Sequence, residues 1–117
     1  MLLTAINQDL LANPTTASYA SLITTYPEIE QEIQRLETAL RALHEKDSES
    51  LLYRTAFELL QHGKQLRERY NSIRGHEDNT FRDLLFFLHA YRISLTFARL
   101  NVEQTLSLFK FRQYLHV

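Results

Sequence analysis

Apolar residues recur along this chain at alternating steps of three and four residues in three separate stretches. A helix repeats every 3.6 residues, so each stretch places its apolar side chains in one row along one helical face. The pattern predicts three long amphipathic helices whose apolar rows are buried. The rows are Tyr19, Leu22, Tyr26, Ile29, Ile33, Leu36, Leu40 and Leu43; Leu52, Ala56, Leu59, Gly63, Leu66, Tyr70 and Ile73; and Phe81, Leu84, Leu88, Tyr91, Leu95, Ala98 and Val102.

Prolines and capping residues predict where helices begin and end in the first half of the chain. A short helix is expected over residues 2–11, because Pro14 disfavours helix in the residue before it. Thr25, Pro27 and Glu28 are arranged as a capping box, so we predict a break near Pro27 and a new helix after it. The alternative is one long helix kinked at Pro27, since the apolar row runs straight through the proline.

Two glycines bear on the second half of the chain. Gly63 lies within the second apolar row, where it costs about 1 kcal/mol relative to alanine, and close approach of another helix explains it better than a hinge. Gly75 follows Arg74 and predicts a left-handed residue that ends this helix. The following helix is expected to begin at Asn79 or the next residue. Residues 80–115 then form either one helix or two, with Asn101 as the cap of the second.

The third predicted helix carries a second apolar row beside the first. With two rows, only a narrow polar strip is left around its circumference. The sequence therefore predicts that this helix is the most buried one and lies at the centre of the fold. The second row consists of Phe86, Ala90, Ile93, Phe97 and Leu100.

These elements predict an all-α fold: an antiparallel bundle of four to five helices forming a single domain of residues 1–117. The chain is 44% hydrophobic and contains only two glycines and two prolines. Such a composition is typical of a globular protein, and it provides too few turn residues for a many-stranded β fold.

Composition also bears on location and on membranes. The chain contains no cysteine, which excludes disulfides and thiolate metal sites and suits the reducing cytoplasm. Residues 81–100 are long and apolar enough to suggest a membrane span, but they carry Arg82, Asp83, Arg92 and Arg99. Each such charge costs roughly 2.5–3.5 kcal/mol near the centre of a bilayer. We therefore expect a cytoplasmic protein with no membrane partner.

The usual signatures of catalysis and of metal binding are missing from the sequence. Gly63 and Gly75 stand alone, so no glycine-rich loop surrounds a phosphate. No glutamate is followed three residues later by histidine, as in dimetal bundles. Glu58 and His62 come nearest to a ligand pair, and a surface hydrogen bond explains them better. We expect no enzyme activity, no metal and no cofactor.

Charge is divided unevenly along the chain. Residues 1–59 contain four basic and nine acidic residues, whereas residues 60–117 contain nine basic and five acidic ones. Three of the bases, Arg82, Arg92 and Arg99, share one side of the third predicted helix, where guanidinium groups could clamp an acidic helix or a phosphate. The alternatives are a solvent-facing strip and internal pairing with the acidic first half. A pI near 6.5 disfavours a nucleic-acid partner.

The C-terminal residues are more apolar than one face of a terminal helix needs to be, and Phe109, Phe111 and Tyr114 stand out among them. Surplus apolar surface of this kind marks association sites, unless the tail folds back across the core. The best-supported function is a non-catalytic adaptor, chaperone or regulatory subunit that acts through helix–helix contacts as a homodimer. Its candidate contact residues are Arg82, Arg92, Arg99, Phe109, Phe111 and Tyr114. The alternative is a regulator that binds a small anionic or phosphate-bearing ligand through the arginines.

Overall fold

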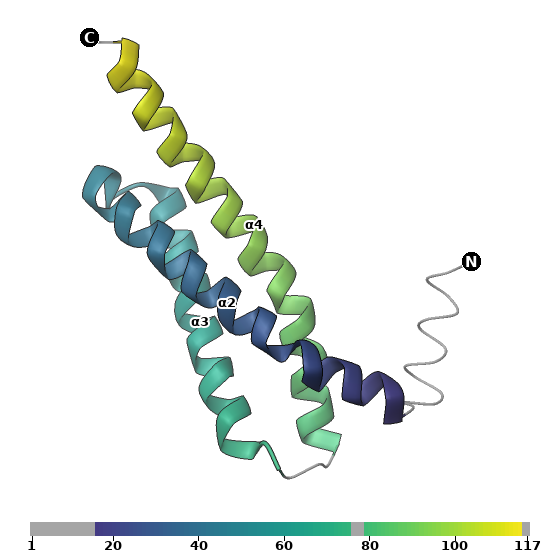
Figure 1. Ribbon diagram of the computed structural model, residues 1–117. Helices are drawn as coiled ribbons and strands as arrows, with labels where there is room; N and C mark the ends of the chain where they lie inside the picture. Colours follow the sequence, from purple (N-terminus) through teal and green to yellow (C-terminus); the bar gives the residue numbers. More distant parts are fainter. Residues whose placement is uncertain (1–15, 76–78, 116–117) are drawn as a thin grey trace.

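The computed structural model describes residues 16–75 and 79–115. Over these residues it contains three α-helices and no strand: α2 (Thr16–Asp47), α3 (Leu51–Ile73) and α4 (Asn79–Leu115). Successive helices run in opposite directions (Figure 1). The all-α class is confirmed and the described residues form a helical bundle, but they contain three helices and not four to five. The helix expected over residues 2–11 lies outside the described residues.

The three predicted apolar rows meet in one core. Wherever the structure describes their side chains, each residue of these rows is buried or partly buried. The sequence periodicity therefore located the inward face of every described helix correctly. The side chains with almost no exposed surface are Ile29, Ile33, Leu36, Leu43, Leu85, Leu88, Leu95 and Val102.

A cluster of aromatic side chains, one from each helix, packs together near the α3–α4 connection. Tyr26 of α2 stacks on Tyr70 of α3 with ring centroids 3.7 Å apart, and Tyr70 lies 5.4 Å from Phe81 of α4. All three rings are buried. Burial raises the pKa of both tyrosine hydroxyls, because an ionised phenolate would lose its hydration there. The cluster adds aromatic contacts to the hydrophobic burial at this end.

The break predicted near Pro27 is wrong, because α2 continues through the proline. Thr25, expected to cap a new helix, instead donates its hydroxyl to the carbonyl of Ser21 (3.0 Å) within α2. A mid-helix proline costs about 3 kcal/mol, but Tyr26 and Ile29 on either side of it are buried in the core. His89 of α4 adds a tertiary hydrogen bond by donating to the carbonyl of Leu22 (2.8 Å). Packing against α4 thus outweighs the local cost of the proline.

The other helix ends follow local sequence chemistry closely. Ser50 caps α3 by accepting a hydrogen bond from the Tyr53 amide (3.1 Å). Gly75 has a φ of 96°, as the predicted left-handed stop requires. Between Asn79 and Leu115, α4 is one continuous helix, so Asn101 starts no separate helix.

The prediction that the third helix is the most buried one is wrong. Its first apolar row packs in the core, but most of the second row is exposed to solvent. α2 crosses α4, and α3 packs beside it (Figure 1), but neither covers the side of α4 that carries the second row. The two other described helices are too few to surround α4, so one apolar face of α4 stays uncovered by the described residues.

Gly63 lies where the three helices meet, which agrees with the prediction that another helix approaches α3 closely at this residue. A Cβ added there would lie 3.4 Å from Tyr91 and 3.5 Å from Leu95 of α4, and 3.7 Å from Ile33 of α2. These are ordinary van der Waals distances, so the site accepts a methyl group and nothing much larger.

We therefore expect Gly63→Ala to raise the free energy of unfolding by about 1 kcal/mol, because alanine is the better helix former and the methyl fills a contact position. Gly63→Leu, in contrast, is expected to destabilise the protein by about 1–3 kcal/mol through overpacking. Urea denaturation followed by circular dichroism measures both. A loss of stability in the alanine variant would contradict the spacing of the helices at this point.

Candidate interaction surface

Along α4 lies an apolar surface that no other described residue covers. We call it the outer row: Phe86, Ala90, Ile93, Phe97, Leu100, Leu108, Phe111 and Leu115. Except for the partly buried Phe86, all of its members are exposed, with 58% of Ile93, 63% of Phe97 and 60% of Phe111 accessible. The steps are again threes and fours, apart from one step of eight in which Gln104 takes the intermediate position. The row therefore runs straight along the helix.

The outer row and the buried row of α4 lie on nearly opposite sides of the helix. Leu95 is fully buried, and Phe97 is 63% exposed. Two residues along a helix correspond to a rotation of about 200°, which explains the contrast. The outer row is thus an independent surface and not a partly exposed edge of the core.

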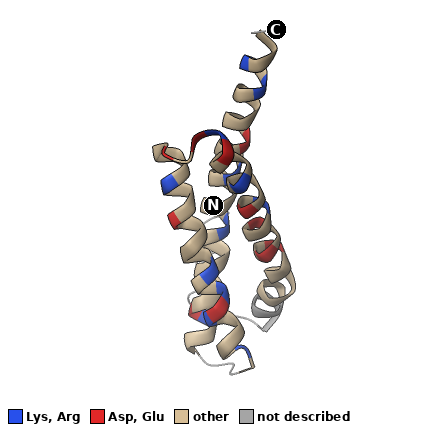
Figure 2. Cartoon of the chain, turned by 90° about the vertical axis from the view of Figure 1, so that its left-hand side faces the viewer, with Lys and Arg blue, Asp and Glu red and all other residues tan. Residues whose placement is uncertain are grey.

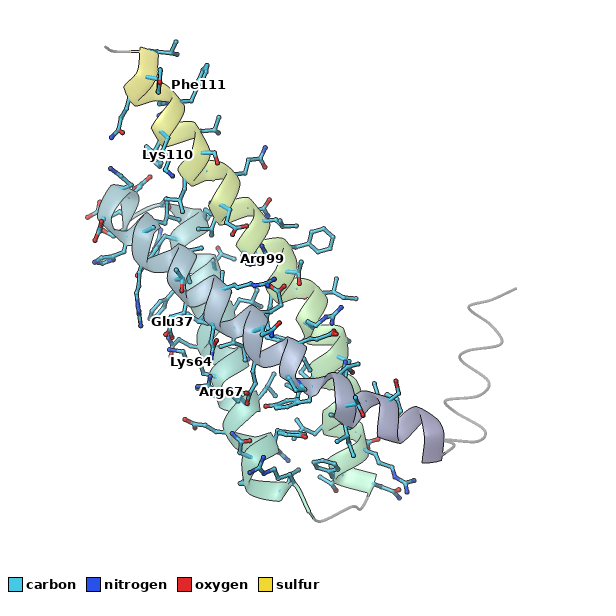
Figure 3. All side chains as sticks on the ribbon, viewed as in Figure 1. Glu37, Lys64, Arg67, Arg99, Lys110 and Phe111 are labelled. Atoms are coloured by element: carbon cyan, nitrogen blue, oxygen red, sulfur yellow. The ribbon has the colours of Figure 1, made fainter. Side chains whose placement is uncertain are left out.

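The C-terminal end of α4 projects past the turn between α2 and α3 (Figure 1). Leu106 and Phe109 are the last α4 residues packed against the core, and residues 110–115 are all exposed. This overhang carries Lys110 and Arg112 and no acidic residue (Figure 2). In Figure 3, Phe111 points away from the bundle. The tail of the described chain thus extends outward and does not fold back across the core.

The six predicted contact residues fall into different surroundings. Phe111 and Tyr114, the latter 85% exposed, lie on the overhang, whereas Phe109 packs against the core. The arginines Arg82, Arg92 and Arg99 are partly buried. The structure therefore brings only the two distal aromatic residues to the accessible surface near the outer row.

Arg99 is held by carboxylates of its own chain. Its guanidinium donates to both oxygens of Glu32 on α2, at 2.8 and 3.2 Å, and to Glu103 at 2.9 Å. The side chains of Arg99 and Glu32 are only 15% and 11% exposed. The hydrogen bond to Glu32 raises the pKa of Arg99 further, so the charge is permanent. Figure 3 shows Arg99 reaching from α4 toward α2.

Arg92 repeats this arrangement two turns earlier, where it pairs with Glu28 of α2 at a more exposed position. Glu28 and Glu32 of α2 therefore neutralise Arg92 and Arg99 of α4 within the fold. Of the alternatives for the arginine strip, internal pairing describes Arg92 and Arg99.

A third ion pair joins α2 to α3 on the far side of the bundle. Lys64 contacts Glu37, and the hydrogen bond between them lowers the pKa of that carboxyl. Glu37 also accepts from Arg41 one turn along α2 (3.0 Å). These groups are partly or fully exposed, so the cluster contributes little stability and serves mainly to orient the helices.

A groove of about 500 Å³ lies between α3 and α4, beside the outer row. Its floor is apolar, and the hydroxyl of Tyr91 donates to the carbonyl of Leu59 there (2.6 Å). Glu58 and His62 line it.

Among the described side chains, no group of three or more histidines and carboxylates is placed to hold a metal ion. None of the described helices is long and apolar enough to cross a membrane.

The exposed part of the outer row is the feature that the sequence pattern misjudged. A signal was present at one position: the spacing of the outer row places Gln104 between Leu100 and Leu108, and this residue is polar.

Comparisons with protein-family models, with curated proteins and with solved structures find no significant match for this chain.

Proposed function

We propose that this protein is a non-catalytic helical interaction module that associates with itself through the outer row of α4. The observation that carries the proposal is one uncovered apolar row running along α4 from Phe86 to Leu115. A role as adaptor, chaperone or regulatory subunit in the cytoplasm fits such a surface. Contacts of this kind need no cofactor and no catalytic group.

The size of the surface supports association. A large aromatic side chain covers about 150–250 Å², so the five outer-row residues that are 54–69% exposed together present at most roughly 450–750 Å². A stable interface buries about 800 Å² on each partner. The largest apolar patch on an ordinary monomer is about 300–600 Å². The outer row therefore approaches the area that one partner buries in a stable interface, and it lies at the upper end of what a monomer leaves open.

The arginine strip supports the alternative function less well. An anionic ligand at Arg92 or Arg99 would have to displace Glu28 or Glu32, which already hold these guanidinium groups. The displaced Glu32 carboxylate would then keep only the more distant Arg35, 3.8 Å away, at a nearly buried position, which is unfavourable. Self-association through the outer row displaces neither Glu28 nor Glu32 from its arginine.

Light scattering on a size-exclusion column tests the proposal. We expect the native chain to have twice the 13.8 kDa mass of one protomer. The Phe97→Glu/Phe111→Glu double variant is expected to have the mass of one protomer with unchanged helix content, because four charges would be buried in each dimer.

The matched control is Gln65→Glu/Asn71→Glu, which adds the same charge at exposed positions of α3 outside the groove beside the outer row. This variant is expected to stay dimeric. A native chain with the mass of one protomer at every concentration reached would overturn the proposal. So would a dimer that the outer-row variant leaves intact.

A further inference from the structure

The residues flanking the outer row differ on its two sides. With Phe97 at the centre and about 100° per residue, Ile93 and Leu100 lie at about −40° and −60°, so one flank is apolar. Ser94 and Asn101 lie at about +60° and +40°, so the other flank is polar. All four residues are exposed. Around Phe97 the face therefore has an apolar side and a polar side, although the exposed Phe87, ten residues earlier, also lies toward the polar side at about +80°.

The same residues are placed symmetrically along the helix. Ser94 and Leu100 are each three residues from Phe97, and Ile93 and Asn101 are each four. Farther out, Ala90 and Gln104 are each seven residues away, and Phe86 and Leu108 are each eleven. A two-fold axis perpendicular to α4 at Phe97 would therefore bring residues 93 and 94 of one copy level with residues 100 and 101 of the other.

In an antiparallel pair of α4 helices, such an axis places the apolar flank of one copy against the apolar flank of the other, and the polar flank against the polar flank. Residues on the same flank meet, so Ile93 of one copy faces Leu100 of the other, and Ser94 faces Asn101. At the next level the small Ala90 faces the long Gln104, which leaves room for the amide side chain. A parallel pair instead brings the apolar flank of one helix against the polar flank of the other, and Ile93 then faces Ser94. Burying Ile93 and Leu100 against each other is the more favourable arrangement.

The charged residues at the two ends of this face also favour the antiparallel orientation. Asp83 lies fourteen residues before Phe97 and Arg112 fifteen residues after it, both exposed and both on the polar flank at about +40° and +60°. In an antiparallel pair Asp83 of each copy faces Arg112 of the other, at both ends of the interface. In a parallel pair aspartate lies level with aspartate and arginine with arginine, which is unfavourable.

From the flanks, the spacing and the charges, we infer that two copies of this chain pair α4 against α4 in antiparallel orientation, with the two-fold axis at Phe97. The inference rests on the proposed function and specifies its partner and its geometry. It makes the interface isologous, so the same residues serve both copies and the assembly closes as a dimer.

Disulfide trapping tests the orientation, and the chain suits it because it contains no cysteine. Ala90→Cys and Gln104→Cys are made in two differently tagged copies, mixed and oxidised. In the antiparallel dimer the two positions face each other, so a mixed Ala90→Cys–Gln104→Cys cross-link is expected. Neither variant is expected to cross-link with itself, because two Ala90 positions are then about 21 Å apart, beyond the roughly 7 Å limit between the Cα atoms of a disulfide.

Two further variants serve as the positive and the negative control for the cross-linking. Phe97→Cys is expected to cross-link with itself in either orientation, and Ser72→Cys, exposed on α3, in neither. Self-cross-links of Ala90→Cys and Gln104→Cys without the mixed product would overturn the antiparallel orientation and leave the proposed function standing. A particle of dimeric mass with no cross-link from any α4 variant would also overturn the inference. A native chain of single-protomer mass would overturn both proposals.

Charge reversal provides an independent test in solution. Asp83→Arg and Arg112→Asp are each expected to raise the dimer Kd by roughly threefold to thirtyfold, because each alters two interfacial pairs. The double variant is expected to recover most of the native Kd, since the pairs re-form with their signs exchanged. In a parallel dimer the two positions lie about 44 Å apart and cannot compensate. A double variant as weak as the product of the single effects would therefore overturn the inference.

Discussion

Replacing Arg99 with leucine is expected to lower the free energy of unfolding by about 2–4 kcal/mol. The substitution leaves the Glu32 carboxylate nearly buried without the two hydrogen bonds that hold it. Breaking a fully buried pair in this way costs about 3–5 kcal/mol. We expect somewhat less here, because Arg35 remains 3.8 Å from Glu32. Urea denaturation at neutral pH measures the loss.

Two controls separate this effect from a general loss of charge. Arg92→Leu removes the more exposed pair with Glu28 and is expected to cost less than about 1 kcal/mol. The double variant Glu32→Leu/Arg99→Leu is expected to regain much of the lost stability, since no charge is left unpaired. If Arg99→Leu proved as mild as Arg92→Leu, the arginine strip would not be part of the bundle's structure, and its role as a ligand site would need to be reconsidered.

Replacing Leu95 with alanine is expected to cost about 3–5 kcal/mol of unfolding free energy. Leu95 has no exposed surface and lies beside Gly63 where the three helices meet. Removing its branched end leaves a cavity that helices on either side cannot close without losing other contacts. Thermal unfolding of a dilute sample, in which the chain is monomeric, measures the effect on the fold alone.

Phe97→Ala, two residues farther along α4, is the matched comparison. In the dilute monomer it is expected to change stability by less than about 0.5 kcal/mol, because its side chain is largely exposed there. At concentrations where the native chain is dimeric, the same variant is expected to dissociate more readily. Similar losses from Leu95→Ala and Phe97→Ala in the monomer would mean that both rows of α4 are buried within one chain, which would contradict the outer row as a free surface.

The comparison of these two residues also shows where sequence reasoning succeeded. The rows containing Ile33, Gly63 and Leu95 were predicted as inward faces, and all three residues are buried. Periodicity identifies such faces because a buried side of a helix must be apolar at every turn. Gly75 was placed correctly for a similarly local reason, since its positive φ is unfavourable for any residue with a Cβ.

Sequence reasoning was wrong where two local signals competed. At Pro27 the missing amide and the capping box indicated a helix end, while the apolar row indicated continuation. The row prevailed because Tyr26 and Ile29 are buried against other helices, a gain that no local rule includes. On α4 two apolar rows were both interpreted as buried, because periodicity counts apolar positions and does not count the helices available to cover them.

The amino-acid sequence by itself determined that the chain is helical, which residues share each helical face, and where α3 ends. All three depend on interactions within a few residues, because helical periodicity and the conformational freedom of glycine are local properties. Only the tertiary structure decided that α2 passes through Pro27, that Glu28 and Glu32 hold Arg92 and Arg99, and that the outer row of α4 is exposed. Those outcomes depend on which helices lie beside one another, and the two other described helices leave the outer row of α4 uncovered.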